Sequence, residues 1–192
     1  MDMRGKKIGV ALTGSFCTFD IAFEIIEMLV EKGAEVTPII SYVVDRLDTR
    51  FHKADDVKTK LVELTGKQII KELTTAEPVG PKNLFDIVLI LPATGNTVAK
   101  LANAITDTPV TMAAKSQMRN KKPVVIAIST NDGLGANAKN IGVLMGMENI
   151  YFVPFEQDAP DVKASSTVFL QGKVLETLEL ALAKEQIQPI LC

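Results

Sequence analysis

What the sequence has little of excludes several classes of protein. Cys17 and Cys192 are the two cysteines, too few for the disulfide framework of a small secreted protein, so we expect a reducing, cytoplasmic setting. No apolar run reaches the roughly 18 to 20 residues of a membrane-spanning helix, and the first residues lack the apolar segment of a signal peptide. The two signs of charge nearly balance, because the chain has 21 lysines and arginines and 23 aspartates and glutamates, which argues against nucleic acid or a membrane surface as a partner. The one histidine, His52, has no second ligand at metal spacing, so we expect no metal site.

The chain is long enough for one sizeable core and too short for two independent ones, so we expect a single domain over residues 1–192. Residues 8–12 form a continuous β-branched run that ends at Thr13-Gly14-Ser15, which is typical of a buried parallel strand. A helical pattern follows, stops at Gly33, and leads to a second apolar run over 36–41. Residues 7–41 therefore predict one βαβ unit with a right-handed crossover.

The same alternation of strand and helix continues along the chain. Further strands are predicted over 87–91, closed by Pro92, and over 124–128 and 150–153. Helices are predicted over about 57–64, 97–104, 110–118, 136–147 and 168–184. The polar segment 44–81 is expected to be an excursion from the core. This order predicts an α/β fold of three layers, a doubly wound, mostly parallel sheet that is Rossmann-like or flavodoxin-like.

Ligands bind such sheets beyond the carboxyl ends of the strands, so the residues that follow each strand are the candidates for a site. These residues are small and carry hydroxyl or amide groups; they are Thr13-Gly14-Ser15, Ser41, the segment 92–97 and the segment 129–132. Hydroxyl and backbone N–H groups can bind a phosphate without a lysine. A P-loop is absent, and the first turn has one glycine where a dinucleotide fingerprint has three, so a mononucleotide fits better than NAD. The alternative is that these residues are only turn formers and helix caps.

The segment Pro92-Ala93-Thr94-Gly95-Asn96-Thr97 resembles the Pro-Ala-x-x-Asn-Thr signature of the homo-oligomeric, flavin-containing cysteine decarboxylase superfamily, and residues 100–107 resemble the segment that follows it there. Gly14-Ser15 corresponds to that family's first phosphate turn, and Asn131 to the asparagine of its Pro-x-Met-Asn motif. The segments 129–132, 151–155 and 157–160 are similar to one branch, the dipicolinate synthase B subunits of spore-forming bacteria. The resemblance covers nearly the whole chain.

The resemblance implies bound FMN, homo-oligomers with flavin sites near subunit contacts, and, for this branch, a partner A subunit and a small dicarboxylate substrate, dihydrodipicolinate. It implies that Gly14, Ser15 and Ser41 approach the phosphate or ribityl chain. The full set of implied cofactor-binding residues is Gly14, Ser15, Ser41, Thr94, Gly95, Asn96, Thr97, Ser129 and Asn131. Asn96 and Asn131 are also the candidates for a catalytic role.

Two departures from the family pattern affect the expected reaction. The decarboxylases use a histidine base, whereas His52 lies in the polar excursion and outside any matching motif. Ser129 and Thr130 precede Asn131 in place of the proline and methionine of the motif. The alternatives to a dipicolinate synthase subunit are therefore a flavin-dependent decarboxylase of unknown substrate, a prenyl-flavin synthase and a non-catalytic partner subunit.

Three further residues are weaker candidates. Cys17 falls at the predicted start of the first helix, where a thiolate would be stabilised, although a free cysteine is more often a small buried hydrophobe. Arg46 and Arg50 offer bidentate contacts suited to a dicarboxylate, although surface arginines are common.

Overall fold

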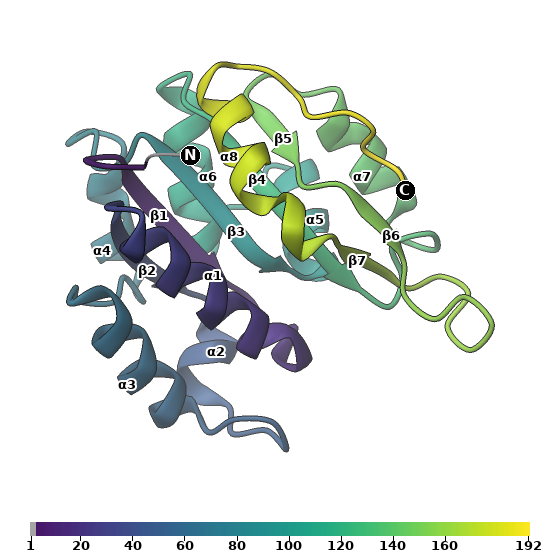
Figure 1. Cartoon of the computed structure of the whole chain (residues 1–192), viewed down its shortest axis with the longest axis horizontal. Helices are drawn as coiled ribbons and strands as arrows, with labels where there is room; N and C mark the ends of the chain where they lie inside the picture. Colours follow the sequence, from purple (N-terminus) through teal and green to yellow (C-terminus); the bar gives the residue numbers. More distant parts are fainter. Residues whose placement is uncertain (1–2) are drawn as a thin grey trace.

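The computed structural model describes residues 3–192, and Figure 1 shows a central twisted sheet with helices on both sides. The strands are β1 Lys7–Leu12, β2 Glu35–Ile40, β3 Ile87–Ala93, β4 Val124–Thr130, β5 Ile150–Phe152, β6 Phe155–Gln157 and β7 Thr167–Phe169. The α-helices are α1 Phe19–Glu31, α2 Tyr42–Arg46, α3 Ala54–Thr65, α4 Leu73–Ala76, α5 Gly95–Ala102, α6 Pro109–Arg119, α7 Ala138–Met145 and α8 Val174–Leu182. Short 3-10 turns are η1 Phe16–Thr18, η2 Glu77–Val79 and η3 Gln171–Lys173. Within these residues the longest helix, α1, has 13 residues, and no helix is long and apolar enough to cross a membrane.

The sheet confirms the predicted α/β class. Its parallel part has the order β2-β1-β3-β4, with β5 paired to the first half of β4. The chain leaves β1 toward β2 on one side and later returns to place β3 on the other side. The carboxyl ends of β1 and β3 therefore flank a switch point, where crossovers diverge and leave a crevice.

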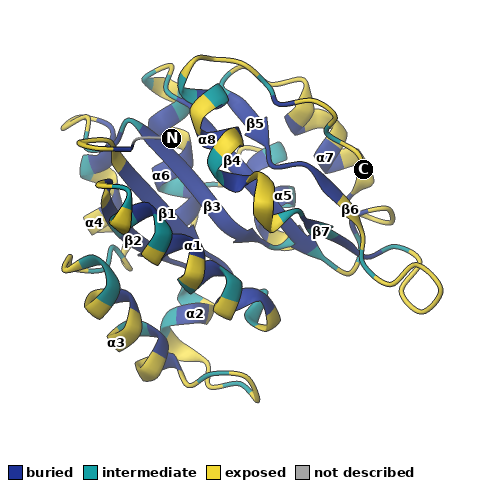
Figure 2. Cartoon of the chain, in the orientation of Figure 1, coloured by how far each residue is buried: buried dark blue, intermediate teal, exposed yellow. Residues whose placement is uncertain are grey.

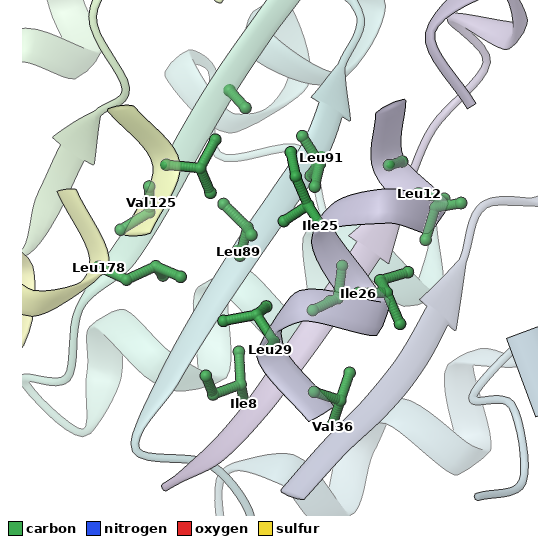
Figure 3. Packing of buried hydrophobic residues seen from close by; sticks show 14 of the residues in the cluster. Ile8, Leu12, Ile25, Ile26, Leu29, Val36, Leu89, Leu91, Val125 and Leu178 are labelled. Atoms are coloured by element: carbon green, nitrogen blue, oxygen red, sulfur yellow. The ribbon is translucent and has the colours of Figure 1, made fainter. Parts of the chain in front are cut away.

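Two apolar clusters fill the space between the sheet and its helical layers. Side chains alternate along a strand, so Leu89 of β3 joins the cluster under α1, α3 and α8, while its neighbours Val88 and Ile90 join the cluster under α5, α6 and α7. Figure 3 shows part of the first cluster, with Leu29 of α1 near Ile8 and Leu89. In Figure 2 the central strands β3 and β4 are buried almost along their whole length, and the helices expose their outer sides.

The strand over 87–91 runs further than the sequence predicts, because Pro92 does not close it. β3 continues to Ala93, and its pairing with β4 shifts after Ile90, so that two residues, Leu91 and Pro92, face one residue of β4. A bulge of this kind accommodates a residue that has no N–H for the ladder. The shift also moves Ala93 to the α5 side of the sheet, next to the site.

The expected helix over 168–184 is wrong in its first part. Val168 lies in β7, which pairs antiparallel with both β6 and the end of β4, and α8 begins only at Val174. The segment 167–169 was missed because a three-residue strand has too short a pattern to separate from the start of an amphipathic helix. The β6–β7 loop projects beyond the sheet at the lower right of Figure 1.

The segment 44–81 is not an excursion from the core, as its polar composition suggested. Val44, Val57 and Leu61 are buried in the cluster under α1, and Ile70 forms a bridge with Ile39 of β2. α3 packs against the core with one face, through Val57 and Leu61, and its other face is polar. Its hydrophobic periodicity is therefore weak in the sequence.

Candidate functional site

A cleft of about 690 Å³ lies beyond the carboxyl ends of β1, β3 and β4. Five of the nine predicted cofactor-binding residues line it, namely Gly14, Ser15, Thr94, Ser129 and Asn131. The other lining residues are Phe16, Cys17, Thr18, Arg50, Phe51, Thr130, Asp158, Lys163, Ser166, Thr167 and Val168. The topology thus brings together turns that are more than 100 residues apart in sequence. Ser41, Gly95, Asn96 and Thr97 do not line the cleft.

Hydroxyl groups tie the turn after β1 to the last part of β4. Ser15 Oγ and Ser129 Oγ lie 2.8 Å apart and share a hydrogen bond. Ser129 is buried and Ser15 is partly exposed, so the pair presents hydroxyl oxygens at the inner end of the cleft. Each hydroxyl has one proton and two lone pairs, so the pair can still exchange hydrogen bonds with a bound polar group.

A second set of hydroxyls joins the turns after β1 and β3. Thr13 Oγ1 donates to the carbonyl of Pro92 at 2.7 Å and accepts from the backbone N–H of Thr94 at 2.9 Å. Thr94 in turn caps α5, because its Oγ1 accepts from the backbone N–H of Thr97. Thr13 is 1% exposed, so it is a buried residue that holds the turns after β1 and β3 together. The sequence placed Thr13 in the turn but did not identify it as this tie.

Gly95 serves close packing. A Cβ at this position would lie 2.6 Å from Asp132 Oδ1 and 2.8 Å from Thr130 Oγ1, and it would also collide with the amide of Asn137. These groups form one hydrogen-bond network. Thr130 Oγ1 donates to Asp132 Oδ1 at 2.6 Å, and Asn137 Nδ2 donates to Asp132 Oδ2 at 2.7 Å. The start of α5 thus packs directly on the turn after β4. Asp132 is the centre of this network, a role that its position in a polar turn did not reveal.

Asn96 and Ser41 lie outside the cleft lining in different ways. Asn96 is exposed in the first turn of α5, two residues after the capping Thr94. Ser41 precedes α2, is 7% exposed, and its Oγ has no hydrogen-bond partner within residues 3–192. A buried hydroxyl without a hydrogen-bond partner is uncommon in folded proteins.

The β6–β7 loop forms one wall of the cleft. Ser166 Oγ lies 3.3 Å from each of three acceptors, Asn131 Oδ1, the Thr130 carbonyl and Asp158 Oδ2. Lys163 Nζ lies 2.9 Å from Asp158 Oδ2, and this hydrogen bond holds the pKa of Asp158 below its usual value. The loop thereby contacts the predicted Asn131 from about 35 residues further along the chain. No local pattern in the sequence indicated this contact, since it depends on the hairpin that was missed.

Arg50 and Phe51, from the segment between α2 and α3, also line the cleft. The guanidinium of Arg50 lies over the ring of Phe51, 4.8 Å from its centre. Arg46, the other candidate for a dicarboxylate, instead lies over the ring of Tyr42 and is not among the lining residues. Cys17 is exposed in the cleft, with Sγ 4.0 Å from Ser15 Oγ.

His52 points away from this cleft. Its ring stacks on Phe19, with ring centres 5.8 Å apart, and its Nε2 lies 3.5 Å from Asp20 Oδ1. It belongs to a separate depression of about 410 Å³ between α1 and α3. The described residues that line the main cleft include no histidine, and Asp158, the carboxylate among them, is engaged by Lys163 and Ser166.

Comparison with known proteins agrees with this geometry. Residues 1–168 match the model of the family described as Flavoprotein. The chain is 48% identical over 189 residues to the B subunit of dipicolinate synthase of Bacillus subtilis, covering 98% of this chain and 94% of that protein. It also superposes on the crystal structure of the B subunit of dipicolinate synthase from Bacillus halodurans, with a TM-score of 0.92, 46% identity and coverage of 100% and 98%. The fold is shared with DmrB of Burkholderia xenovorans, solved in complex with FMN, at a TM-score of 0.63, 20% identity and coverage of 91% and 98%.

Proposed function

The chain belongs to the flavoprotein family and is a homologue of the B subunit of dipicolinate synthase, and on that premise we propose that it binds FMN in the cleft beyond β1, β3 and β4. We propose further that it is one flavoprotein domain over residues 1–192 and acts in the cytoplasm during sporulation. There it works with an A subunit in the oxidation of dihydrodipicolinate to dipicolinate.

The position and lining of the cleft support this proposal more than any other observation. In a sheet with the strand order 2-1-3-4-5, FMN binds at the switch point between β1 and β3, which is where this cleft lies. Its volume is in the range of about 300–1,000 Å³ that is usual for ligand sites. Its lining includes the hydroxyl groups of Ser15, Thr94 and Ser129 and the amide of Asn131, which suit a phosphate and a polar ring.

Within the proposal, the site residues have separate roles. Gly14, Ser15, Ser41 and Ser129 hold the phosphate or the ribityl chain, and Thr94, Gly95 and Thr97 shape the adjacent turn. Asn96 and Asn131 offer both a donor and an acceptor, so they bind a carbonyl and a ring N–H and orient the reacting groups. FMN, when bound, supplies the acceptor for the two electrons that leave the substrate.

The A subunit enters because the chain lacks a second nucleotide site. The sequence has no three-glycine fingerprint followed by an acidic residue about 20 positions on. Electrons therefore pass to or from a pyridine nucleotide held by the partner. The exposed apolar side chains of Val43, next to Gly14, and of Phe51, in the cleft lining, also favour self-association that covers the site.

A flavin-dependent decarboxylase fits the cleft less well. General base catalysis near neutral pH is usually performed by histidine, and His52 points away from the cleft. Release of carbon dioxide from cysteine-containing peptides would nevertheless be the direct assay for that activity.

Two measurements test the proposal. FMN should raise the melting temperature of flavin-free protein, because a ligand that binds only the native state stabilises it, while FAD should raise it much less. In mixtures with the A subunit, dipicolinate absorbance should appear with NADP, and neither protein on its own should produce it at a comparable rate. No stabilisation by saturating FMN would defeat the cofactor assignment. Full activity of the A subunit on its own would leave this chain a structural or regulatory role.

A further inference from the structure

We propose that Arg50 and Lys163 bind the two carboxylates of the substrate, with Asp158 as the carboxylate that Lys163 releases when the substrate enters. This inference rests on the proposed function, because it assigns residues to the substrate of the same cleft. The two cations come from two separate loops, the segment between α2 and α3 and the loop between β6 and β7. In Figure 1 the segment between α2 and α3 lies at the bottom of the molecule and the β6–β7 loop projects at its right side.

Arg50 has the features of a carboxylate ligand. It lines the cleft, and its guanidinium is held against the ring of Phe51. It has no ion pair with any carboxylate in residues 3–192, so its fork of N–H donors is available to a ligand. An arginine stacked on an aromatic ring is ordered in advance and loses less freedom when it binds a planar carboxylate.

Lys163 supplies the second cation in a different state. Its Nζ already contacts Asp158 Oδ2 at 2.9 Å, and both side chains are about half exposed, so a competing carboxylate can reach the ammonium. Asp158 retains the hydroxyl of Ser166 as a partner when Lys163 turns to a ligand. The exchange replaces one ion pair by another and leaves no charge buried alone.

The charged residues that line the cleft favour an anion over a cation as its ligand. Its charged lining residues are two cations, Arg50 and Lys163, and one carboxylate, Asp158. The remaining polar lining is hydroxyl and amide, including the Ser15–Ser129 pair. In the proposal, a ligand with two carboxylates engages both cations, whereas a ligand with one carboxylate binds Arg50 and leaves Lys163 on Asp158.

Isothermal titration of the full chain with pyridine-2,6-dicarboxylate, with and without saturating FMN, tests the proposal. We compare wild type with Arg50→Gln, Lys163→Gln and Asp158→Asn, and use Lys53→Gln as the control. Lys53 is exposed near Arg50 and lies outside the cleft lining, and its replacement removes the same charge. Circular dichroism checks that each variant is folded, and the FMN affinity of each is measured separately. Pyridine-2-carboxylate serves as the ligand with one carboxylate.

Arg50→Gln should weaken the dicarboxylate by about tenfold or more, as expected for the loss of a charge-assisted pair. Lys163→Gln should weaken it by a smaller factor and should not change the affinity for the monocarboxylate. Asp158→Asn should strengthen dicarboxylate binding, because the competing carboxylate is gone, and Lys53→Gln should match wild type. The unchanged affinity of Lys53→Gln separates this two-cation site from a general effect of charge, because that variant loses the same positive charge outside the cleft lining.

The two-cation site would be overturned if wild type did not bind the dicarboxylate, or if wild type, Arg50→Gln and Lys163→Gln bound it with equal affinity. Neither result would affect the proposal that the chain binds FMN. Loss of FMN affinity in Arg50→Gln with unchanged dicarboxylate binding would also overturn the two-cation site, by assigning Arg50 to the cofactor. If wild type binds the dicarboxylate through Arg50 but binds no FMN, the two-cation site is supported and the proposed cofactor fails.

Discussion

The hydroxyl oxygens of Ser15 and Ser129 lie 2.8 Å apart although 114 residues separate them in sequence. Ser15 follows β1 and Ser129 lies near the end of β4, with β3 between these two strands in the sheet. The contact therefore crosses the carboxyl end of β3, over the switch point where the cleft opens. Both serines belong to the set of cofactor-binding residues that the family resemblance implies.

Replacing either serine by alanine should weaken FMN binding by a few-fold to about tenfold, as expected for a hydrogen bond worth about 0.5–1.5 kcal/mol. The double variant should lose less than the sum of the single losses, because each hydroxyl orients the other. Fluorescence quenching of free FMN on titration with protein measures the affinities. Ser165→Ala is the matched control, since this serine lies in the β6–β7 loop outside the cleft lining. Unchanged FMN affinity in the double variant would contradict the assignment.

Gly95→Ala should lower the free energy of unfolding by about 1–3 kcal/mol, because the added methyl group collides with Asp132 and Thr130. Gly142 offers the opposite case, since a methyl group there meets open space on α7. Gly142→Ala should raise the free energy of unfolding by roughly 0.5–1 kcal/mol through helix propensity. Urea unfolding of the two variants beside wild type measures both changes. Equal stabilities of Gly95→Ala and wild type would show that α5 does not pack on the turn after β4 as described.

Asn96→Asp should weaken FMN binding without destabilising the chain. Asn96 is exposed in the first turn of α5, where a carboxylate is favourable for the helix by about 0.3–1 kcal/mol. The same carboxylate repels an electron-rich ring carbonyl or a phosphate. Asn96→Ala removes the amide without adding charge and should weaken binding less. FMN titration and urea unfolding of both variants separate binding from stability. Normal FMN affinity in Asn96→Asp would remove Asn96 from the site.

Asp158 should make a small, pH-dependent contribution to stability. Its folded-state pKa is lowered by the hydrogen bond from Lys163, so the contribution is present above the ordinary value of 3.8 and is lost as the pH falls through the folded-state pKa. Both side chains are about half exposed, so the contribution should be about 0.2–1 kcal/mol. The stability difference between wild type and Asp158→Asn, followed by urea unfolding from neutral pH downward, should shrink over that window. A difference independent of pH would mean that the ion pair does not stabilise the loop.

Periodicity and turn chemistry determined much of this protein from the sequence alone. The continuous apolar runs of β1, β3 and β4 predict parallel strands buried on both faces, because only such strands bury every side chain. Residues that follow those strands meet at one edge of a parallel sheet whatever their separation, so Gly14, Ser15, Thr94, Ser129 and Asn131 were predictable as neighbours. The family resemblance rested on the same turns.

Tertiary structure alone decided the features that depend on partners distant in sequence. β7 forms because it pairs with β4 and β6. Its three residues are too few to show a periodic pattern in the sequence. Because the sequence pattern does not predict the β6–β7 hairpin, it could not predict that Asp158, Lys163 and Ser166 lie at the cleft. Arg46 and Arg50 look equivalent in the sequence, yet α2 directs one onto Tyr42 while the following segment carries the other into the cleft. Local sequence sets which groups a turn contains, whereas long-range packing sets which groups from other segments they meet.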